Sequence, residues 1–450
     1  MNIHLIAIGG SAMHNIALAL ESKGYNVTGS DDEIYEPARS RLAAKGLLPK
    51  SGWSPEKIHE KLDLVILGMH AKADNPELLK AEELGIKVVS YPEFVYDQSK
   101  DKIRIVVAGS HGKTTTTAMI MHVLKYDNKS FDYLVGALLE GFDTMASFSD
   151  APIIVIEGDE YLSSPIDRIP KMLHYKPHIA ILTGIAWDHI NVFPVFEQYL
   201  QQFKLFMESI VDGGQLIYYR HDLNIQNLVK DMVRPIDLIP YEYFPYYVEN
   251  GQLNIDLNKK TQSIKVFGQH NLENMQAAYF ALKKVGITDD QFLEAIGEFK
   301  GAAKRLQLIK KGLRDIAYLD FAHAPSKVSA TLKAIKERFP DLLIFALLEL
   351  HTFSSLDPSF LNEYAGTLDI ADQAIVFTDE NALKMKGKQS ISEEMIKKSF
   401  QNQKMLVIND NLQLVEFCYR IKDKPKCLLF MSSGTFGNLD IAQLCEEIIQ

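Results

Sequence analysis

Short apolar runs rich in β-branched residues alternate with amphipathic stretches along almost the whole chain. The runs are Ile3–Ile8, Leu64–Leu67, Ile103–Ala108, Ile153–Ile156, Ile179–Thr183, Leu342–Leu347, Ala374–Phe377 and Lys426–Met431. Continuous apolar runs of this length are typical of strands buried on both faces, as in parallel sheets. The helical periodicity between them indicates βαβ units. The pattern therefore predicts an α/β protein with doubly wound sheets.

Two segments interrupt this rhythm where domain boundaries are expected. Residues 97–102 are polar and stand before a new strand, and residues 300–304 follow a helical stretch and contain Gly301. At roughly 150 residues per domain, the 450-residue chain is expected to form about three domains. The predicted domains are 1–99, 100–300 and 301–450. Within the second, residues 241–267 carry the hairpin signal Asn250-Gly251, which predicts a small antiparallel sheet.

Composition narrows the functional classes. The chain has 48 basic and 58 acidic residues, a net charge of −10, which argues against a nucleic-acid-binding protein. Its 3 cysteines do not make a disulfide framework, so a reducing compartment is expected. No apolar run approaches the roughly 18 residues of a membrane helix, and no cationic leader precedes the first strand. We expect a cytoplasmic protein with no nucleic-acid, membrane or obligate protein partner.

The first predicted strand ends in a glycine turn. Gly9-Gly10-Ser11 precedes a helical stretch, and a second strand ends at Gly29-Ser30-Asp31, which places Asp31 22 residues after Gly9. Such a turn lets backbone amides approach a phosphate, and the later acid can hold a ribose hydroxyl. The full Gly-x-Gly-x-x-Gly pattern is absent, so a nucleotide site and a ligand-free turn remain about equally supported by this segment.

A second glycine turn has the character of a phosphate-binding loop. Strand 103–108 leads into Gly109-Ser110-His111-Gly112-Lys113-Thr114-Thr115, and a helical stretch follows. The glycines allow a tight curve whose amides point at phosphate. Lys113 supplies a cation for the β- and γ-phosphates, and Thr114 offers a hydroxyl to Mg²⁺. A Walker A loop would have glycine in place of Val107, but the strand before and the helix after favour a nucleoside triphosphate site over a chance match.

Acidic residues follow the next two predicted strands. Strand 153–156 runs into Glu157-Gly158-Asp159-Glu160, and strand 179–183 is followed by Asp188-His189. A carboxylate at the carboxyl end of a core strand beside a phosphate loop suits Mg²⁺. The alternatives are a solvated acidic loop for Asp159 and Glu160 and a capped loop for Asp188-His189.

These motifs together resemble the Mur ligase family. Further matches are Gly268-Gln269-His270-Asn271-Leu272-Glu273-Asn274, Arg305 and Asp320-Phe321-Ala322-His323-Ala324-Pro325, so six motifs occur in order over most of the chain. The resemblance implies an ATP-dependent amide-bond ligase of peptidoglycan synthesis with three domains. They are a Rossmann-like domain for a uridine nucleotide, a central P-loop ATPase-like domain, and a C-terminal Rossmann-like domain for the incoming amine.

The resemblance also implies roles for the matching residues, with ATP and Mg²⁺ as cofactors. The phosphate site would comprise Gly109, Ser110, His111, Gly112, Lys113, Thr114 and Thr115, and the metal site Thr114, Glu157 and His189. Adenine would lie at His270, Asn271 and Asn274. Arg305 would reach the γ-phosphate, and Asp320 with His323 would border the nucleotide. Gly9, Gly10, Ser11, Ser30 and Asp31 would hold the UDP group. Lys204 stands where several members carry a carbamylated lysine, but a surface lysine is the favoured interpretation.

The first glycine turn resembles the branch that uses UDP-N-acetylmuramate. Two activities share this small-molecule substrate: one adds L-alanine, and the other adds the recycled tripeptide L-Ala-γ-D-Glu-meso-diaminopimelate. The stretch 30–37, the long gap between Glu157 and His189, and the ending 431–437 favour the tripeptide, with L-alanine as the alternative. Ala324, Gln307 and the segment 348–354 depart from the expected patterns.

Mechanistic expectations follow from the resemblance and from two further features. An acyl phosphate would form on the muramyl carboxylate, and His323 or a nearby acid would accept a proton from the attacking amine. Residues 300–304 would act as a hinge that closes the site. The loop 432–437 could hold a peptide carboxylate through its amides, or serve only as a connector. A nicotinamide dehydrogenase and a catalytically inactive ATP-binding protein are the rival classes.

Overall fold

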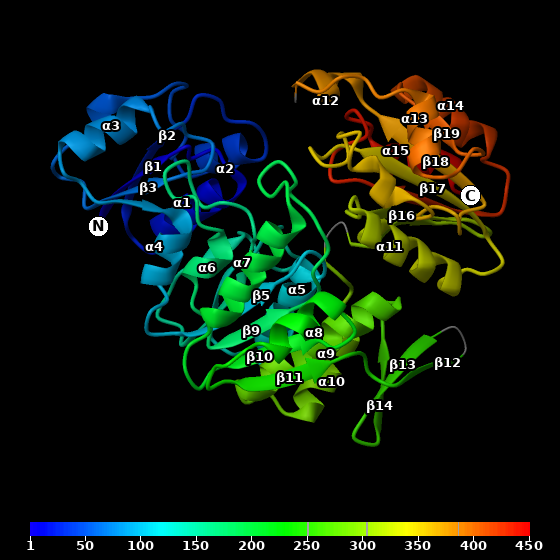
Figure 1. Cartoon of the computed structure of the whole chain (residues 1–450), viewed down its shortest axis with the longest axis horizontal. Coiled ribbons are helices and arrows are strands. Elements are labelled where there is room, and N and C mark those ends of the chain that lie inside the picture. Colours follow the sequence, from blue (N-terminus) through cyan, green and yellow to red (C-terminus); the bar gives the residue numbers. More distant parts are fainter. Residues whose placement is uncertain (250–251, 303–304, 386) are drawn as a thin grey trace. The chain divides into compact units, whose positions relative to one another are not determined.

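The structure is a computed structural model that describes residues 1–249, 252–302, 305–385 and 387–450. It divides into two compact units. The first unit comprises residues 1–185, 197–242 and 274–296, and the second comprises 186–196, 243–273 and 297–450. The strands form four sheets, three of them mostly parallel, which confirms the predicted α/β class (Figure 1). Among the described residues, no helix has the length and apolar character needed to span a bilayer.

The N-terminal sheet is fully parallel, with strand order β2-β1-β3-β4. Its strands are β1 (Asn2–Ile6), β2 (Asn26–Ser30), β3 (Leu64–Leu67) and β4 (Val88–Ser90). Its helices are α1 (Ser11–Ser22), α2 (Ala38–Ala44), η1 (Pro55–Lys57), α3 (Pro76–Glu83) and α4 (Tyr91–Asp97). Every residue of β3 is buried, because apolar side chains cover both faces of this central strand.

A seven-stranded sheet forms the rest of the first unit, with order β11-β10-β9-β5-β8-β6-β7 and only β7 antiparallel to its neighbour. Its strands are β5 (Ile103–Ala108), β6 (Asp132–Leu134), β7 (Ala146–Ser147), β8 (Ile153–Glu157), β9 (Ile179–Leu182), β10 (Gln215–Tyr219) and β11 (Asp237–Tyr241). The helices of this region are α5 (Lys113–Tyr126), α6 (Lys171–His174), α7 (Phe196–Glu208), α8 (Leu223–Lys230), α9 (Gln269–Lys284) and α10 (Asp289–Glu298). Because β5 pairs with both β8 and β9, the loops after these three strands emerge side by side.

The predicted small antiparallel sheet is confirmed in the second unit. Strands β12 (Tyr246–Glu249), β13 (Gln252–Leu257) and β14 (Lys260–Ile264) pair in that order. The predicted turn residues Asn250 and Gly251 lie outside the described residues, and the pairing of Glu249 with Gln252 brackets them.

The C-terminal sheet has the order β15-β16-β20-β17-β18-β19, with β15 antiparallel to β16 and the rest parallel. Its strands are β15 (Gln307–Lys311), β16 (Ile316–Asp320), β17 (Leu343–Leu350), β18 (Gln373–Thr378), β19 (Leu406–Ile408) and β20 (Lys426–Met431). Its helices are α11 (Pro325–Arg338), η2 (Leu361–Tyr364), α12 (Glu380–Met385), α13 (Glu393–Ser399), α14 (Asn411–Arg420) and α15 (Ile441–Ile448).

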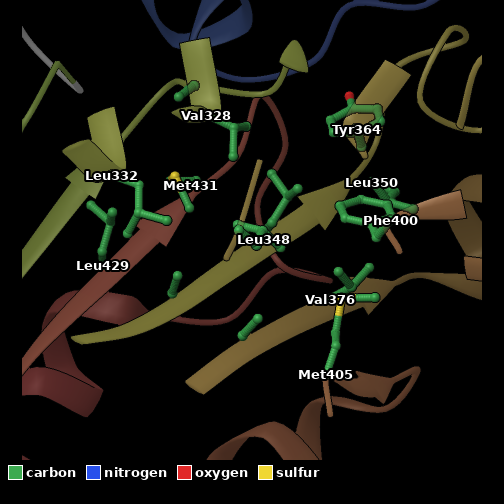
Figure 2. Close-up of a cluster of buried hydrophobic side chains, with 14 of the residues drawn as sticks. Val328, Leu332, Leu348, Leu350, Tyr364, Val376, Phe400, Met405, Leu429 and Met431 are labelled. Atoms are coloured by element: carbon green, nitrogen blue, oxygen red, sulfur yellow. The ribbon is translucent and has the colours of Figure 1, made fainter. Parts of the chain in front are cut away.

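Two apolar layers cover this C-terminal sheet. Leu429 and Met431 of β20 belong to the cluster drawn in Figure 2, together with Val328 of α11. The alternating residues Leu428 and Phe430 pack into a second cluster on the opposite face. Side chains alternate between the faces of a strand, so both sets are buried only when both faces are covered. This double coverage explains the continuous apolar run that the sequence shows.

The three cysteines lie in this domain and are buried. Burial raises the pKa of each thiol, Cys418, Cys427 and Cys445, to about 12. A thiol with such a pKa stays protonated near neutral pH, and only the thiolate is a good nucleophile or metal ligand. The cysteines therefore act as small core residues.

Candidate functional site

The predicted phosphate loop follows β5 and curves against the end of β9. The amide of Ser110 donates to the carbonyl of Gly184 (2.9 Å), and the hydroxyl of Thr183 donates to the carbonyl of His111. Gly109 has φ = +128°, and a Cβ there would lie 2.2 Å from the Thr183 hydroxyl. The loop therefore needs glycine at this position. Gly112 (φ = +75°) is the N-cap of α5, so the amides at the start of this helix face the loop.

Lys113 lies in the loop with its ammonium group anchored on two sides. Its Nζ donates to the Gly109 carbonyl and to Glu160 Oε2, both at 2.6 Å. Burial opposes the charged form, but the carboxylates of Glu160, Asp159 and Glu157 outweigh it and raise the pKa of Lys113. The Lys113 ammonium is thus a fixed cation beside the phosphate loop.

Thr114 and Glu157, two of the three predicted metal ligands, lie together at the ends of neighbouring elements. The Thr114 hydroxyl donates to Glu157 Oε1 (2.9 Å), and the Gly136 amide donates to Glu157 Oε2 (2.9 Å). A hydroxyl beside a carboxylate is a set of hard oxygen donors, which suits Mg²⁺. The third predicted ligand, His189, belongs to the second unit, and its place in the metal site stays a prediction.

Asn274, predicted to contact adenine, lies directly behind the loop. The hydroxyl of Thr116 donates to Asn274 Oδ1 (3.2 Å), and a Cβ on Gly112 would come within 2.4 Å of the same oxygen. His270 precedes Asn274 by one helical turn on α9. Burial lowers the pKa of His270. Asn271 uses its side chain for the Phe267 carbonyl (2.8 Å), so its contribution is local.

The predicted UDP turn is held together by its acid. The Gly9 amide donates to Asp31 Oδ2 (2.7 Å), and a Cβ on Gly9 would meet that oxygen at 2.9 Å. Ser30 is fully buried, and its carbonyl accepts from the amides of Ala7 and Ile8. Ser11 is the first residue of α1, with Gly10 as its N-cap. The sequence placed Gly9, Gly10 and Ser11 after the first strand and Ser30 and Asp31 at the end of the second, and hydrogen bonds join these two segments in the structure.

Helix α1, which follows this turn, is joined to the segment before β7 of the seven-stranded sheet by residues that no sequence motif marks. Asn15 of α1 accepts from the Met145 amide (2.9 Å) and from Arg41 (3.0 Å). Arg41 also donates to the Asp143 carbonyl. No local motif marks this set, because Asn15 and Arg41 lie more than 100 residues from the Met145 and Asp143 backbone groups that they contact.

In the second unit, Asp320 organises the predicted nucleotide-bordering loop. Its carboxylate accepts from the amides of Leu306 (2.6 Å) and Ala322 (2.7 Å) and thereby joins the segment after Arg305 to the end of β16. The Arg305 guanidinium stacks on the Phe321 ring, 4.6 Å from its centre. Asp320 is buried, and its hydrogen bond to the Leu306 amide holds the segment next to Arg305, while its predicted place beside the nucleotide stays a prediction. Of the predicted hinge 300–304, residues 303 and 304 lie outside the described residues.

His323 is held by its own loop and is neutral. Its Nδ1 lies 2.8 Å from the Phe321 carbonyl, and Tyr364 donates to the His323 carbonyl. Burial and the charge of Lys327 lower the pKa of His323 to about 3. Burial alone would raise the pKa of Asp188, but the neighbouring His189 and Lys327 lower it to about 2. An imidazole with so low a pKa is a weak base, so the pKa favours a hydrogen-bonding role for His323 over proton abstraction.

Local contacts bear on two further sequence hypotheses, those for loop 432–437 and for Lys204. The Phe436 amide (2.9 Å) and the Ser432 hydroxyl both donate to the buried carboxylate of Glu349, so an internal acid occupies the place predicted for a peptide carboxylate in loop 432–437. These contacts favour the alternative prediction that the loop is a connector, and the sequence did not show that β17 carries an acid to it. Lys204 is exposed and lines a surface pocket of about 370 Å³ with Met207, as a surface lysine would.

Comparison with known proteins gives one consistent assignment. Three sequence models match in order: Mur ligase family, catalytic domain (residues 2–102), Mur ligase middle domain (107–282) and Mur ligase, glutamate ligase domain (304–434). The UDP-N-acetylmuramate–L-alanine ligase of Caldicellulosiruptor bescii is 31% identical over 87% of this chain and 86% of its own length.

Two further relatives are named as ligases of a peptide and not of L-alanine. The UDP-N-acetylmuramate–L-alanyl-γ-D-glutamyl-meso-2,6-diaminoheptandioate ligase of Haemophilus influenzae is 27% identical and covers 97% of both chains. The crystal structure of a murein peptide ligase from Psychrobacter arcticus has the same fold, with a TM-score of 0.69 at 22% identity, over 100% of this chain and 98% of that one. The family is one of ATP-dependent ligases that form C–N bonds, which removes the dehydrogenase alternative. This chain belongs to the Mur ligase family.

Proposed function

We propose that this ligase joins the carboxylate of UDP-N-acetylmuramate to the amine of L-Ala-γ-D-Glu-meso-diaminopimelate in the cytoplasm, with release of ADP and phosphate. The observation that carries the tripeptide specificity is the match to a ligase of that name over 97% of both chains. The alternative is ligation of L-alanine, which the 31% identity to an L-alanine ligase favours. In either case the partners are small molecules.

The long segment between Glu157 and His189, from which the sequence favoured the tripeptide, is folded against the N-terminal domain. Residues 159–174 contain a bridge between Leu162 and Pro170 and helix α6, and they contact the N-terminal domain. Ser90 donates to Asp167 (2.8 Å), and the Lys171 ammonium lies 5.8 Å from the centre of the Tyr91 ring. This segment thus lies between the substrate-binding domain and the phosphate loop of the first unit.

At the nucleotide, Lys113 would bind the β- and γ-phosphates in the loop 109–115. Mg²⁺, held by Thr114, Glu157 and His189, would offset negative charge on those phosphates. Asn274 and His270 would contact adenine on one face of α9. Arg305 would add a second cation at the γ-phosphate, positioned by the Asp320 contacts described above.

Chemistry begins at the muramyl carboxylate, which is a poor electrophile near neutral pH. One of its oxygens attacks the γ-phosphorus, the bond to ADP breaks, and an acyl phosphate forms. Lys113 and Arg305 would stabilise the charge that spreads over the transferred group. The amine then attacks the carbonyl carbon, and phosphate leaves with the carboxylate oxygen that made the attack.

The amine must lose a proton before or during this attack. Since the pKa of His323 is only about 3, this imidazole is a weak base near neutral pH, and we propose that it acts as a neutral hydrogen-bond partner. Asp188, whose pKa is about 2, is ionised at neutral pH and is a still weaker base, so neither side chain is assigned as the general base. Water would destroy the acyl phosphate, so exclusion of solvent by movement at residues 300–304 stays part of the proposal.

The decisive test of specificity is a product assay with the full chain. The protein is incubated with ATP, Mg²⁺ and UDP-N-acetylmuramate plus either the tripeptide or L-alanine, and both phosphate release and product mass are followed. Product that depends on the tripeptide supports the proposal, and product that depends on L-alanine supports the alternative. Phosphate release without either amine would contradict both. The Glu157→Gln variant should lose turnover in whichever reaction is found, because it removes one charged metal ligand.

A further inference from the structure

Glu160 is buried beside the phosphate loop, which excludes the alternative of a solvated acidic loop for this residue. It is the third residue after Glu157 at the end of β8, and its exposed fraction is 0%. A fully buried carboxylate is costly unless it is paired and hydrogen-bonded. Its partners therefore identify what the residue does.

The two oxygens of Glu160 contact two different parts of the phosphate-loop region. Oε2 accepts from the Lys113 ammonium (2.6 Å), and Oε1 accepts from the hydroxyl of Tyr199 (3.1 Å). Tyr199 in turn lies 2.8 Å from the hydroxyl of Ser110. One carboxylate therefore joins the lysine and the serine of the same loop.

Tyr199 is a rigid part of this arrangement. Its exposed fraction is also 0%, and its ring packs edge-to-face on Phe203 of the same helix, with ring centres 5.1 Å apart. A buried aromatic ring held by such a contact fixes the direction of its hydroxyl. The position of Glu160 is consequently set by α7 as well as by its own loop.

The contacts of Lys113 show how this frame suits ATP. An ammonium group has three N–H donors. Within the part of the chain that the structure describes, its hydrogen bonds go to Gly109 and Glu160, which leaves one donor for a phosphate oxygen. Lys113 does not have to abandon Glu160 to bind a nucleotide.

We propose that Glu160, supported by Tyr199, is a positioning residue that holds the Lys113 ammonium in place for phosphoryl transfer and stays bound to it in the ATP complex. The proposal rests on the ATP-dependent ligase activity given above and adds a residue to its machinery. The effect of Glu160 is greatest in the transition state, where the charge on the transferred group is largest and displacement of the Lys113 ammonium removes the most stabilisation.

The neighbouring Asp159 offers a control that matches the loss of charge. Its carboxylate is paired with Lys171 (2.5 Å), not with Lys113. Asp159→Asn therefore removes one negative charge from the same loop without releasing the Lys113 ammonium. A purely electrostatic effect of the loop charge would appear in both Asp159→Asn and Glu160→Gln, whereas positioning would appear only in the second.

The experiment compares Glu160→Gln, Glu160→Asp, Tyr199→Phe and Asp159→Asn by steady-state kinetics and by equilibrium binding of ADP and AMP. We expect Glu160→Gln to lower kcat at least about tenfold, while the KM for ATP changes less than about threefold. Removal of a transition-state donor itself lowers the rate roughly 100-fold or more, and the loss of its positioning is expected to account for part of that effect. ADP should bind a few-fold more weakly and AMP unchanged, because AMP has no β-phosphate for Lys113. Glu160→Asp should restore part of kcat, Tyr199→Phe should show a smaller loss of the same kind, and Asp159→Asn should stay within about twofold of wild type.

Equal effects of Glu160→Gln and Asp159→Asn would overturn the proposal, and so would an unchanged kcat in Glu160→Gln. A parallel loss of ADP and AMP binding would also overturn it, since that result indicates a misfolded loop. The binding measurements do not use the muramyl or peptide substrates. Failure of wild-type turnover would therefore count against the proposed function, and the ADP and AMP results would still test the position of Lys113.

Discussion

The Asp31 carboxylate in the N-terminal turn should make the stability of that domain depend on pH in an unusual direction. Burial, with a contribution from neighbouring Asp32, raises the pKa of Asp31 from 3.8 to about 6, although the Gly9 amide partly opposes this. Its side chain is almost fully buried. The folded protein therefore binds a proton more tightly than the unfolded chain, and stability falls as the pH rises through this window.

The shift sets the size of the effect. A difference of about 2.2 pKa units at about 1.36 kcal/mol per unit gives an ionisation penalty of about 3 kcal/mol well above pH 6. Between pH 4.5 and 7.5, the same two pKa values predict a loss of about 2 kcal/mol. Asp31→Asn keeps an oxygen that can accept from Gly9 but cannot ionise. The wild type should lose about 2 kcal/mol relative to this variant over that range.

Trp53 provides a local probe for this measurement. The chain has 2 tryptophans, and Trp53 packs against the core of the N-terminal sheet while Trp187 belongs to the second unit. Urea unfolding followed by fluorescence in a Trp187→Phe background therefore reports on the N-terminal domain, which avoids treating several domains as one transition. Wild-type and Asp31→Asn stabilities that change in parallel from pH 4.5 to 7.5 would show that Asp31 does not ionise with a raised pKa. Asp32→Asn should shrink the difference.

Two further predictions concern loop geometry and a buried ion pair. Gly112→Ala should weaken nucleotide binding by at least about 100-fold, because its Cβ would meet Asn274 Oδ1 at 2.4 Å at φ = +75°. Gly213→Ala is the control: it has the same φ with nothing within 4 Å, so it should leave binding unchanged and cost only about 1 kcal/mol of stability. Titration with ADP measures the binding, and urea unfolding measures the stability. Lys426→Met should destabilise the C-terminal domain by about 3–5 kcal/mol in urea unfolding, because it leaves the buried Asp315 without its 2.7 Å partner; the added change Asp315→Leu should recover much of that loss, and no recovery would contradict the ion-pair explanation.

Much of the fold could be predicted because local patterns specify it. The apolar run at β20 predicted a strand covered on both faces, and the two core layers of the C-terminal sheet confirm it. The loop of Gly109 and Gly112 was predicted from the positions of its glycines, and both have positive φ in the structure. Proximity of Thr114 and Glu157 followed from a rule on parallel strands, since β5 and β8 are neighbours with their carboxyl ends at one edge.

The contacts that sequence reasoning missed are those between residues far apart in the chain. For Glu160, the sequence left a metal-binding carboxylate and a solvated loop both open, and the structure shows that the side chain is buried and accepts from Tyr199 of α7. Glu349 likewise reaches loop 432–437 from another strand and occupies the place predicted for a ligand. The low pKa of His323 depends on burial, which a motif does not specify. In each case the sequence showed the residue but did not show which distant residues surround it.

The central claim, that the muramyl carboxylate is activated as an acyl phosphate, can be tested by isotope transfer. UDP-N-acetylmuramate labelled with ¹⁸O in both carboxylate oxygens is incubated with the wild-type protein, ATP, Mg²⁺ and the tripeptide. The released phosphate and the ligated product are then analysed by mass spectrometry. An acyl-phosphate intermediate predicts one ¹⁸O atom in each phosphate and one in the new amide, because the oxygen that attacked the γ-phosphorus leaves with it. Product formed with unlabelled phosphate would contradict it.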